Sequence, residues 1–512
     1  MASPNEKLAD ALSALKALQD GSQRIFRSKD LSRVHRERLL KTGFLREITK
    51  GWLMSASPQT QEGDTTPWYA SFWEFCTRYC GERFGKDWYL SPEQSLLLHA
   101  EATAIPRQVI INSTKGTNNN LVLPFGTSLY DLKVKEPPQA DDLSEKSGLR
   151  VYSPDAAIIK VPEAFFQRAP VEAQIVLSSI RDESGILGRL LDGGHSAVAG
   201  RIVGAFRRTG RTAFADDIIS TMKGAGYDVR EIDPFAKQHH VPVILPGVSP
   251  IVSRLKAIWE AQRGTVMEIF RQPPGLASDK AGYLKFVDEI YRSDAYHSLS
   301  IEGYNVTPEL IDRVRLGSWN PEIDQTDRQI RDALAARGYW QAFEKVKESI
   351  VGILDGAPSG ALARGEHRAW YRELFQPSVT AGILRPSALA GYRTSPVYLR
   401  GSSHITPRAE SVAEGMNALF DLLEKESEPS VRAVLGHWLV GYLHPYPDGN
   451  GRMARFLMNV MLASGGYPWT IVRVEDRETY LSGLETASVQ MDLGPFTTFL
   501  AERVQWSIEK AS

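Results

Sequence analysis

The chain has 512 residues, of which 42% are hydrophobic and 24% charged, and its 60 Lys and Arg nearly balance 61 Asp and Glu, for a formal net charge of −1. This composition is that of an ordinary soluble protein and excludes the disordered and collagen-like classes. The length predicts about two to four domains. The balanced charge gives the whole chain no electrostatic attraction to nucleic acid or membrane.

Residues 1–60 are predicted to form a winged helix-turn-helix. Leucines at helical spacing predict a helix over 8–18, and Ser28 is expected to cap a second helix. Residues 44–48 and 52–54 flank a Thr-Lys-Gly turn and predict a hairpin. Helices followed by a hairpin are typical of a winged helix.

The charge of this segment is uneven. Residues 24–50 hold nine Lys and Arg against three Asp and Glu. Such an excess on a helix and hairpin would neutralise phosphates, with the helix in the major groove, so DNA is a candidate partner of residues 24–50. A solvated basic face, or a module that binds protein, is the alternative.

An α+β domain is expected over residues 61–240. Short β-like runs such as 109–111 and 121–123 alternate with helical stretches near 162–181, 195–208 and 212–224. In the order of its elements, the winged helix followed by this segment resembles abortive-infection antitoxin regulators.

A proline-containing connector is predicted over 241–279, followed by an all-α domain over 280–512. Apolar periodicity in this domain predicts helices over 284–296, 339–354, 410–425, 430–443, 451–464 and 494–508.

Neither a metal-binding cysteine cluster nor a membrane span is expected. Cys76 and Cys80 are the only cysteines, and they are interpreted as buried thiols because a zinc site needs more ligands. The chain has no run of about 18 apolar residues and no apolar leader. A reducing, cytoplasmic location is the expectation.

One stretch carries a recognisable chemistry. Residues 444–455 read His-Pro-Tyr-Pro-Asp-Gly-Asn-Gly-Arg-Met-Ala-Arg, between two apolar helical stretches. Glycines on either side of Asn450 let backbone N–H groups point inward at the start of the following helix, where the helix dipole favours anions. The residues predict a loop that binds phosphates.

The charged side chains of this loop add a metal and a base to that prediction. Arg452 and Arg455 can reach one anion from the same helix face. Asp448 in this cationic setting suits Mg²⁺ on the phosphates, and His444 is a ready general base. The alternative, a structural turn beside a core histidine, does not explain the combination.

The stretch resembles the Fic-family motif His-Pro-x-x-Asp-Gly-Asn-Gly-Arg-x-x-Arg, and the likeness extends over about residues 280–508. The resemblance implies a helical bundle that transfers AMP from ATP to a Ser, Thr or Tyr hydroxyl of a target protein or of the chain itself. It implies His444 as the base and Asp448 as the Mg²⁺ ligand. It also implies phosphate or nucleotide contacts by Gly449, Asn450, Gly451, Arg452, Arg455 and, after the motif, Tyr480. The family most often has Phe where this chain has Tyr446.

An inhibitory pattern of the same family is expected upstream. Ser298, Glu302 and Gly303 match Ser/Thr-x-x-x-Glu-Gly/Asn at the end of a predicted amphipathic helix. The resemblance implies that Glu302 pairs with Arg455 and takes the place of the γ-phosphate. A surface glutamate without a partner is the alternative.

Residues 394–401 form an alternating run that resembles the family's β-hairpin flap, on which an extended target segment pairs as a strand. The residues implied in docking are Val397, Tyr398, Leu399 and Arg400.

Two other functions remain open from the sequence. The loop could use another nucleotide donor, or the chain could be a DNA-binding regulator or antitoxin in which the Fic domain acts as a sensor. The sequence does not identify the target protein or decide whether the chain forms a homo-oligomer.

Overall fold

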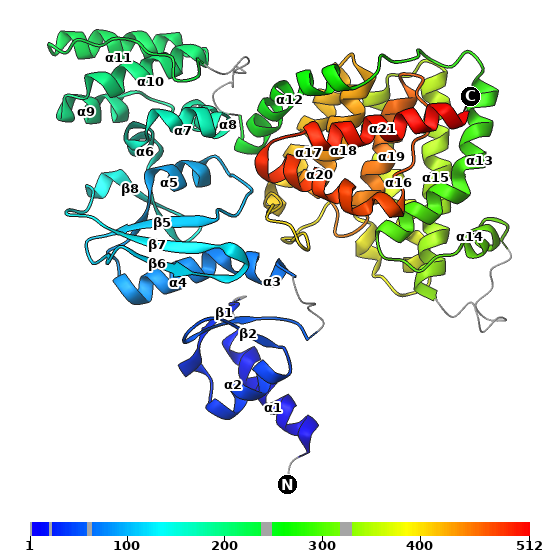
Figure 1. Cartoon of the computed structure of the whole chain (residues 1–512), viewed down its shortest axis with the longest axis horizontal. Helices are drawn as coiled ribbons and strands as arrows, with labels where there is room; N and C mark the ends of the chain where they lie inside the picture. Colours follow the sequence, from blue (N-terminus) through cyan, green and yellow to red (C-terminus); the bar gives the residue numbers. More distant parts are fainter. Residues whose placement is uncertain (1–2, 20–22, 59–63, 237–247, 318–329, 512) are drawn as a thin grey trace. The chain divides into compact units, whose positions relative to one another are not determined.

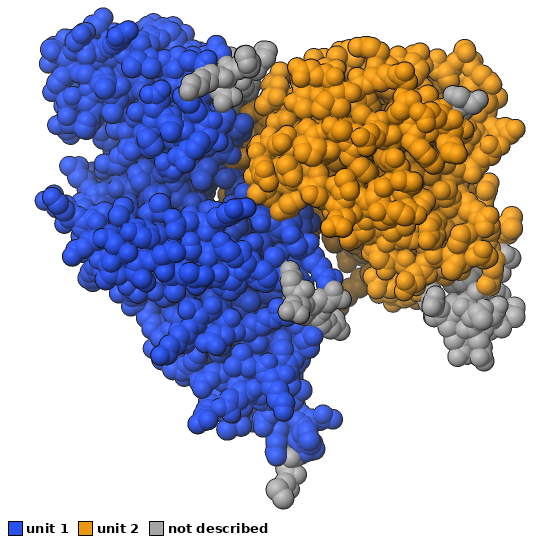
Figure 2. Space-filling view, viewed as in Figure 1, with its two compact units in different colours: residues 1–250, 398–405 blue, residues 251–397, 406–512 orange. Residues whose placement is uncertain are grey.

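The computed structural model describes residues 3–19, 23–58, 64–236, 248–317 and 330–511. The chain divides into two compact units, residues 1–250 with 398–405 and residues 251–397 with 406–512 (Figure 2). Within the described ranges, no helix has the length and apolarity needed to cross a bilayer.

The N-terminal segment has three antiparallel strands in the order β1-β3-β2. Its elements are α1 (Pro4–Leu18), β1 (Ile25–Arg27), η1 (Ser28–Asp30), α2 (Arg33–Lys41), β2 (Leu45–Thr49) and β3 (Trp52–Ser55). The helix over 8–18 and the hairpin are therefore as predicted, while β1 was not predicted. The predicted cap at Ser28 is wrong. Ser28 lies in η1, where the Asp30 carboxylate accepts a hydrogen bond from Arg27 N at 2.7 Å, and Ser32 Oγ caps α2 instead.

This small sheet is covered on both faces. Phe26 and Leu53 pack in a core with α1 and α2, whereas the neighbouring Ile25, Trp52 and Met54 pack in a core with α4 (Phe72–Phe84). The alternation follows from the two-residue period of a strand. The N-terminal segment thus shares a core with the region that follows it.

The α+β region contains a four-stranded sheet of order β4-β5-β7-β6, in which β5 and β7 are parallel, and a separate hairpin β8-β9 (Figure 1). Its strands are β4 (Tyr89–Leu90), β5 (Gln108–Ser113), β6 (Asn119–Val122), β7 (Ser128–Lys133), β8 (Leu143–Lys146) and β9 (Leu149–Tyr152). Its helices are α3 (Thr66–Tyr69), α4, α5 (Pro92–His99), α6 (Pro154–Lys160), α7 (Glu163–Arg168), α8 (Pro170–Ser179), α9 (Ser184–Gly193), α10 (Ser196–Arg208) and α11 (Thr212–Gly224). Cys76 and Cys80 are buried in α4, and burial raises the pKa of the Cys76 thiol.

The second unit is helical (Figure 1). Its helices are α12 (Pro250–Ile269), α13 (Lys280–Ile301), α14 (Pro308–Arg315), α15 (Ile330–Leu354), α16 (Ser359–Thr380), α17 (Ala409–Lys425), α18 (Pro429–Leu443), α19 (Asn450–Ala463), α20 (Arg477–Gln490) and α21 (Gly494–Ala511), with short turns η5 (Pro386–Leu389) and η6 (Val474–Asp476). Each helix predicted beyond residue 280 has a counterpart in this set.

The predicted connector contains part of this bundle. Ile251, Leu255 and Trp259 of α12 belong to the same core as the helices beyond residue 280. We therefore propose that the C-terminal domain begins with α12. Residues 241–247 of the predicted connector lie outside the described residues.

Candidate active site

The loop between α18 and α19 is shaped by two residues with left-handed backbone. His444 ends α18 with φ 47°, and Gly449 precedes α19 with φ 82°. The Asn450 side chain crosses the loop, accepting from Tyr446 N at 2.9 Å and donating to Tyr446 O at 2.8 Å. Asn450 therefore fixes the loop that the sequence predicted as a phosphate nest.

His444 is uncharged at neutral pH. Burial, together with the charge of Arg393, lowers the pKa of its imidazole to about 4. A neutral imidazole can accept a proton, so the side chain suits the role of a general base.

The two motif arginines lie in the first two turns of α19, and each has an N–H donor that no described residue uses. Arg452 and Arg455 are 1% and 3% exposed, and Arg452 Nε and Arg455 Nη1 have no hydrogen-bond partner among the described residues. Buried donors normally have partners, so these two favour an anionic ligand. The partly exposed Asp448 carboxylate accepts from Gly449 N at 2.6 Å and lies 3.4 Å from Arg452 Nη2.

Glu302 faces this loop. Its Oε1 accepts from Arg455 Nη2 at 2.7 Å, and the Glu302 side chain is 27% exposed. Burial acts to raise the pKa of Glu302, but the charges of Arg455 and Arg452 outweigh it and hold this pKa below the usual range. A Cβ added to Gly451 would collide with the Glu302 carboxylate, so the carboxylate lies directly against the glycine turn. The structure thus contains the pairing that the sequence predicted.

The end of α13 places Glu302. Tyr304 N donates to Leu299 O at 3.1 Å and Gly303 N donates to Ser300 O at 3.0 Å, which is a Schellman motif. Gly303 has φ 85°, a conformation that favours glycine. One turn earlier, Ser298 accepts from Arg455 Nε at 2.9 Å through its hydroxyl and from Nη2 at 3.1 Å through its carbonyl.

Asp294, one turn before Ser298, was not predicted. Its carboxylate is 3% exposed and accepts from Tyr339 Oη at 2.6 Å. Burial raises the pKa of Asp294 to about 6. Asp294, Ser298 and Glu302 are spaced by four residues, a signal of one shared helix face that the sequence does contain.

Arg393 also went unpredicted. Its guanidinium is 3% exposed and donates to the carbonyls of His444 at 2.8 Å and Ser395 at 3.0 Å, as well as to Pro407 O. Its backbone N–H donates to Pro445 O at 2.8 Å. Arg393 therefore ties the left-handed turn at His444 to Ser395 in the predicted flap and to Pro407 beyond it.

The predicted flap is a turn and contains little regular strand. Val397 O accepts from Thr406 Oγ1 at 2.7 Å, and Tyr398 forms an isolated antiparallel bridge with Ile405. The chain then reverses, with Ser402 N donating to Leu399 O at 3.2 Å. Among the described residues of this run, no strand longer than the bridge forms, because Gly401 adopts φ 77° within a short reversal.

Two motif-associated tyrosines are buried. Tyr480 is 2% exposed and its hydroxyl lies 2.8 Å from His437 Nε2, so the structure places it in the core near Arg455. The Tyr446 ring stacks on Tyr371 at 4.0 Å between centroids, and the Tyr446 hydroxyl has no hydrogen-bond partner among the described residues.

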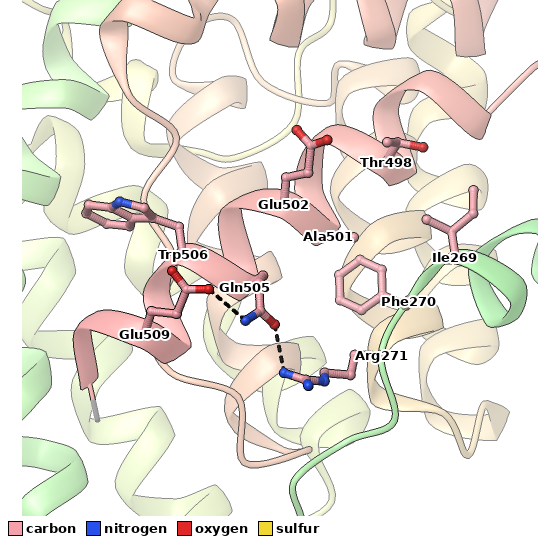
Figure 3. A pocket seen from close by; sticks show the side chains of 9 residues that line it. All are labelled: Ile269, Phe270, Arg271, Thr498, Ala501, Glu502, Gln505, Trp506 and Glu509. Atoms are coloured by element: carbon pink, nitrogen blue, oxygen red, sulfur yellow. Dashed lines mark hydrogen bonds between the residues drawn. The ribbon is translucent and has the colours of Figure 1, made fainter.

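A surface hollow elsewhere in this unit is separate from the loop. It encloses about 550 Å³ between the end of α12 and α21, beside Phe270 and Trp506 (Figure 3). Arg271 Nη1 donates to Gln505 Oε1 at 2.8 Å along its floor. None of its lining residues belongs to residues 444–455.

In the described part of the chain, no group of three or more His, Cys, Asp or Glu forms a metal cluster.

The second unit is a helical bundle in which a left-handed loop leads into a helix that carries two buried arginines. Residues 362–462 match the Fic/DOC family, so the second unit carries a Fic domain.

Known proteins match part of the chain. A Nematostella vectensis protein named protein adenylyltransferase Fic is 38% identical over 227 residues, which are 44% of this chain and 49% of the relative. Protein adenylyltransferase fic-1 of Caenorhabditis elegans is 35% identical over 133 residues, 25% of this chain and 26% of the relative. The matches thus span half or less of these curated relatives.

A solved structure of Fic-1 residues 134–508 from C. elegans aligns with a TM-score of 0.37 and 19% identity, covering 67% of this chain and 96% of that chain.

Proposed function

We propose that the chain is a protein adenylyltransferase that transfers AMP from ATP to a hydroxyl side chain of a target protein and of itself. The observation that carries the proposal is the Glu302–Arg455 pair at 2.7 Å, beside arginine donors that have no hydrogen-bond partner among the described residues. A carboxylate is an anion that can hold the place of a phosphate.

The residues of the loop have distinct roles in the proposed transfer of AMP. Neutral His444 takes the proton of the target hydroxyl, and the oxygen attacks the α-phosphorus of ATP. The bond from that phosphorus to the bridging oxygen breaks, pyrophosphate leaves, and AMP stays on the target. Backbone N–H groups at Gly449 to Gly451 and the two arginines would stabilise charge on the phosphates.

Magnesium fits the loop through Asp448. The carboxylate is 61% exposed, and Mg²⁺ is usually held by one or two carboxylates together with substrate phosphates and water. The ion would neutralise charge on the phosphates. Asp448 would orient the ion beside Arg452.

The resting chain is proposed to be inhibited by Glu302. While its carboxylate pairs with Arg455, a γ-phosphate cannot take the same donor. Because the Glu302 side chain is 27% exposed, displacement does not require the core to open.

The test is the mass of the protein after incubation with ATP and Mg²⁺. Glu302→Gly should gain one or more AMP groups, wild type fewer, and Glu302→Gly with His444→Ala none. Lack of any label in Glu302→Gly, with its fold intact by circular dichroism, would overturn the proposal. Competition among ATP, GTP, CTP and UTP distinguishes adenylylation from use of another donor.

A second role is proposed for the N-terminal segment, namely DNA binding by the winged helix. The strand order β1-β3-β2 with α2 beside it supports this role, and the Arg33 side chain is 82% exposed. However, Arg33 pairs with Glu37, and Arg36 and Arg38 donate to backbone carbonyls. Binding to duplex DNA that weakens with salt, and is lost when Arg33, Arg36 and Arg38 become Ala, would support DNA over a protein partner.

A further inference from the structure

The flap turn, residues 398–405, pairs with a segment of the chain almost three hundred residues upstream. Ala104 and His404 form an antiparallel bridge. Ile105 N donates to Ser403 O at 3.0 Å, and Ile405 N donates to Thr103 O. Ile405 bridges to Tyr398 on its other side. Thr103–Ile105 thus lies beside the flap as a third extended segment, joined to it by an isolated bridge.

The residues of this pairing are buried in the first unit. Thr103, Ile105 and His404 are 7%, 6% and 2% exposed, and Ile405 packs against the apolar cluster that contains Trp68 and Leu129. Pro106 follows the segment and lacks an N–H, so the pairing ends there. Removing a segment whose side chains are buried in this way costs more free energy than removing an exposed peptide.

We propose that residues Thr103–Ile105 are a permanent strand of the flap, so that a target segment pairs only along the opposite edge, at Tyr398. This inference rests on the proposed function. Among the described residues, Tyr398 makes no further bridge beyond that to Ile405. The main chain of an extended target segment would pair at Tyr398, on the side away from Ile405.

The N-terminal region also contacts side chains of the flap turn. The Arg24 guanidinium lies 5.7 Å from the centre of the Tyr398 ring, and Arg400 Nε lies 3.9 Å from Asp64 Oδ2. The partner that fits is a protein segment in extended conformation, held chiefly by its main chain.

The test is a disulfide across the bridge. The two hydrogen bonds flank Ala104 and His404, which makes them a non-hydrogen-bonded pair with closely spaced Cβ atoms, a geometry that a disulfide fits. The variant is Ala104→Cys with His404→Cys in Glu302→Gly. Its matched control is Ala102→Cys with His404→Cys, which shifts the pair by two residues. Peptide mapping without reduction detects the disulfide. AMP incorporation is measured before and after reduction.

We expect the 104–404 pair to cross-link readily, the control pair poorly, and labelling to be within about twofold in oxidised and reduced protein. Loss of labelling on oxidation, restored by reduction, would show that the segment must leave the flap and would overturn the proposal. Failure to cross-link in protein that still labels would also overturn it. If no variant labels, the proposed function fails, while the cross-link still decides the strand arrangement.

Hydrogen exchange gives a readout independent of activity. The amides of Ile105 and Ile405 should exchange slowly, and equally so with and without ATP in Glu302→Gly. Rapid exchange of both amides when ATP is present would contradict a permanent strand.

Discussion

Ser298 holds Arg455 through two hydrogen bonds that do not involve Glu302, at 2.9 Å to Nε and 3.1 Å to Nη2. Removing the Glu302 carboxylate therefore leaves the guanidinium in place and frees a donor. The end of α13 that supplies the proposed inhibitory Glu302 thus also holds Arg455, the proposed phosphate ligand.

Ser298 is thus expected to contribute most to ATP binding when the Glu302 carboxylate is absent. Adding Ser298→Ala to Glu302→Gly should weaken ATP binding by about five- to tenfold, because a lost hydrogen bond to a charged group is worth about 1 kcal/mol or more. Isothermal titration calorimetry measures the change. Ser300→Ala, on the same helix, serves as the control and should bind ATP like Glu302→Gly. Equal affinity in all three proteins would show that Ser298 does not position Arg455.

Arg393 is expected to act as a positioning residue. Arg393→Lys in the Glu302→Gly background should slow AMP incorporation by about 10²-fold, since a shift of about 1 Å in a catalytic group has that effect. A lysine ammonium cannot span the carbonyls of His444, Ser395 and Pro407. ATP affinity should stay unchanged, because the carbonyls that the Arg393 guanidinium binds at His444, Ser395 and Pro407 lie outside α19. The exposed Arg385→Lys is the matched control, and a normal rate in Arg393→Lys would contradict the assignment.

Tyr446→Phe should preserve or raise stability. The substitution removes a buried hydroxyl with no partner among the described residues and keeps the ring stacked on Tyr371, for a gain of up to about 1 kcal/mol. Tyr339→Phe is the comparison, because it removes a 2.6 Å hydrogen bond to the Asp294 carboxylate and should cost about 1–3 kcal/mol. Urea unfolding of both variants tests the contrast. A loss in Tyr446→Phe as large as in Tyr339→Phe would mean that the Tyr446 hydroxyl has a partner.

Asp294 should make the free energy of unfolding depend on pH in a definite direction. Its pKa is raised from 3.8 to about 6 in the folded protein, so the folded state takes up this proton before the unfolded chain does. The free energy of unfolding of wild type relative to Asp294→Asn should therefore rise as pH falls through 6, by about 1 kcal/mol at pH 5. Other ionisable groups are common to both proteins and cancel in the difference. A difference that stays constant from pH 8 to pH 5 would show that Asp294 titrates normally.

Local sequence predicted the loop at residues 444–455 and six helices of the second unit, namely α13, α15, α17, α18, α19 and α21, whereas α14, α16 and α20 were not predicted. The residues from His444 to Arg455 are near neighbours, so their chemistry follows from spacing between two apolar helices. Glu302 could be assigned because it ends an amphipathic helix and is followed by Gly303, which stops that helix in a left-handed conformation.

Tertiary structure decided which distant groups meet. Arg393 reaches the His444 carbonyl, and Ala104 bridges to His404, through contacts that carry no periodic signal because hydrogen bonds to backbone do not depend on the partner's residue type. Burial likewise gives Asp294 its raised pKa, which its sequence position alone does not reveal. The sequence identified the loop at residues 444–455 as the candidate site. Long-range packing fixed the Arg393 contacts that tie this loop to the flap, and the bridge between Ala104 and His404 that borders the flap.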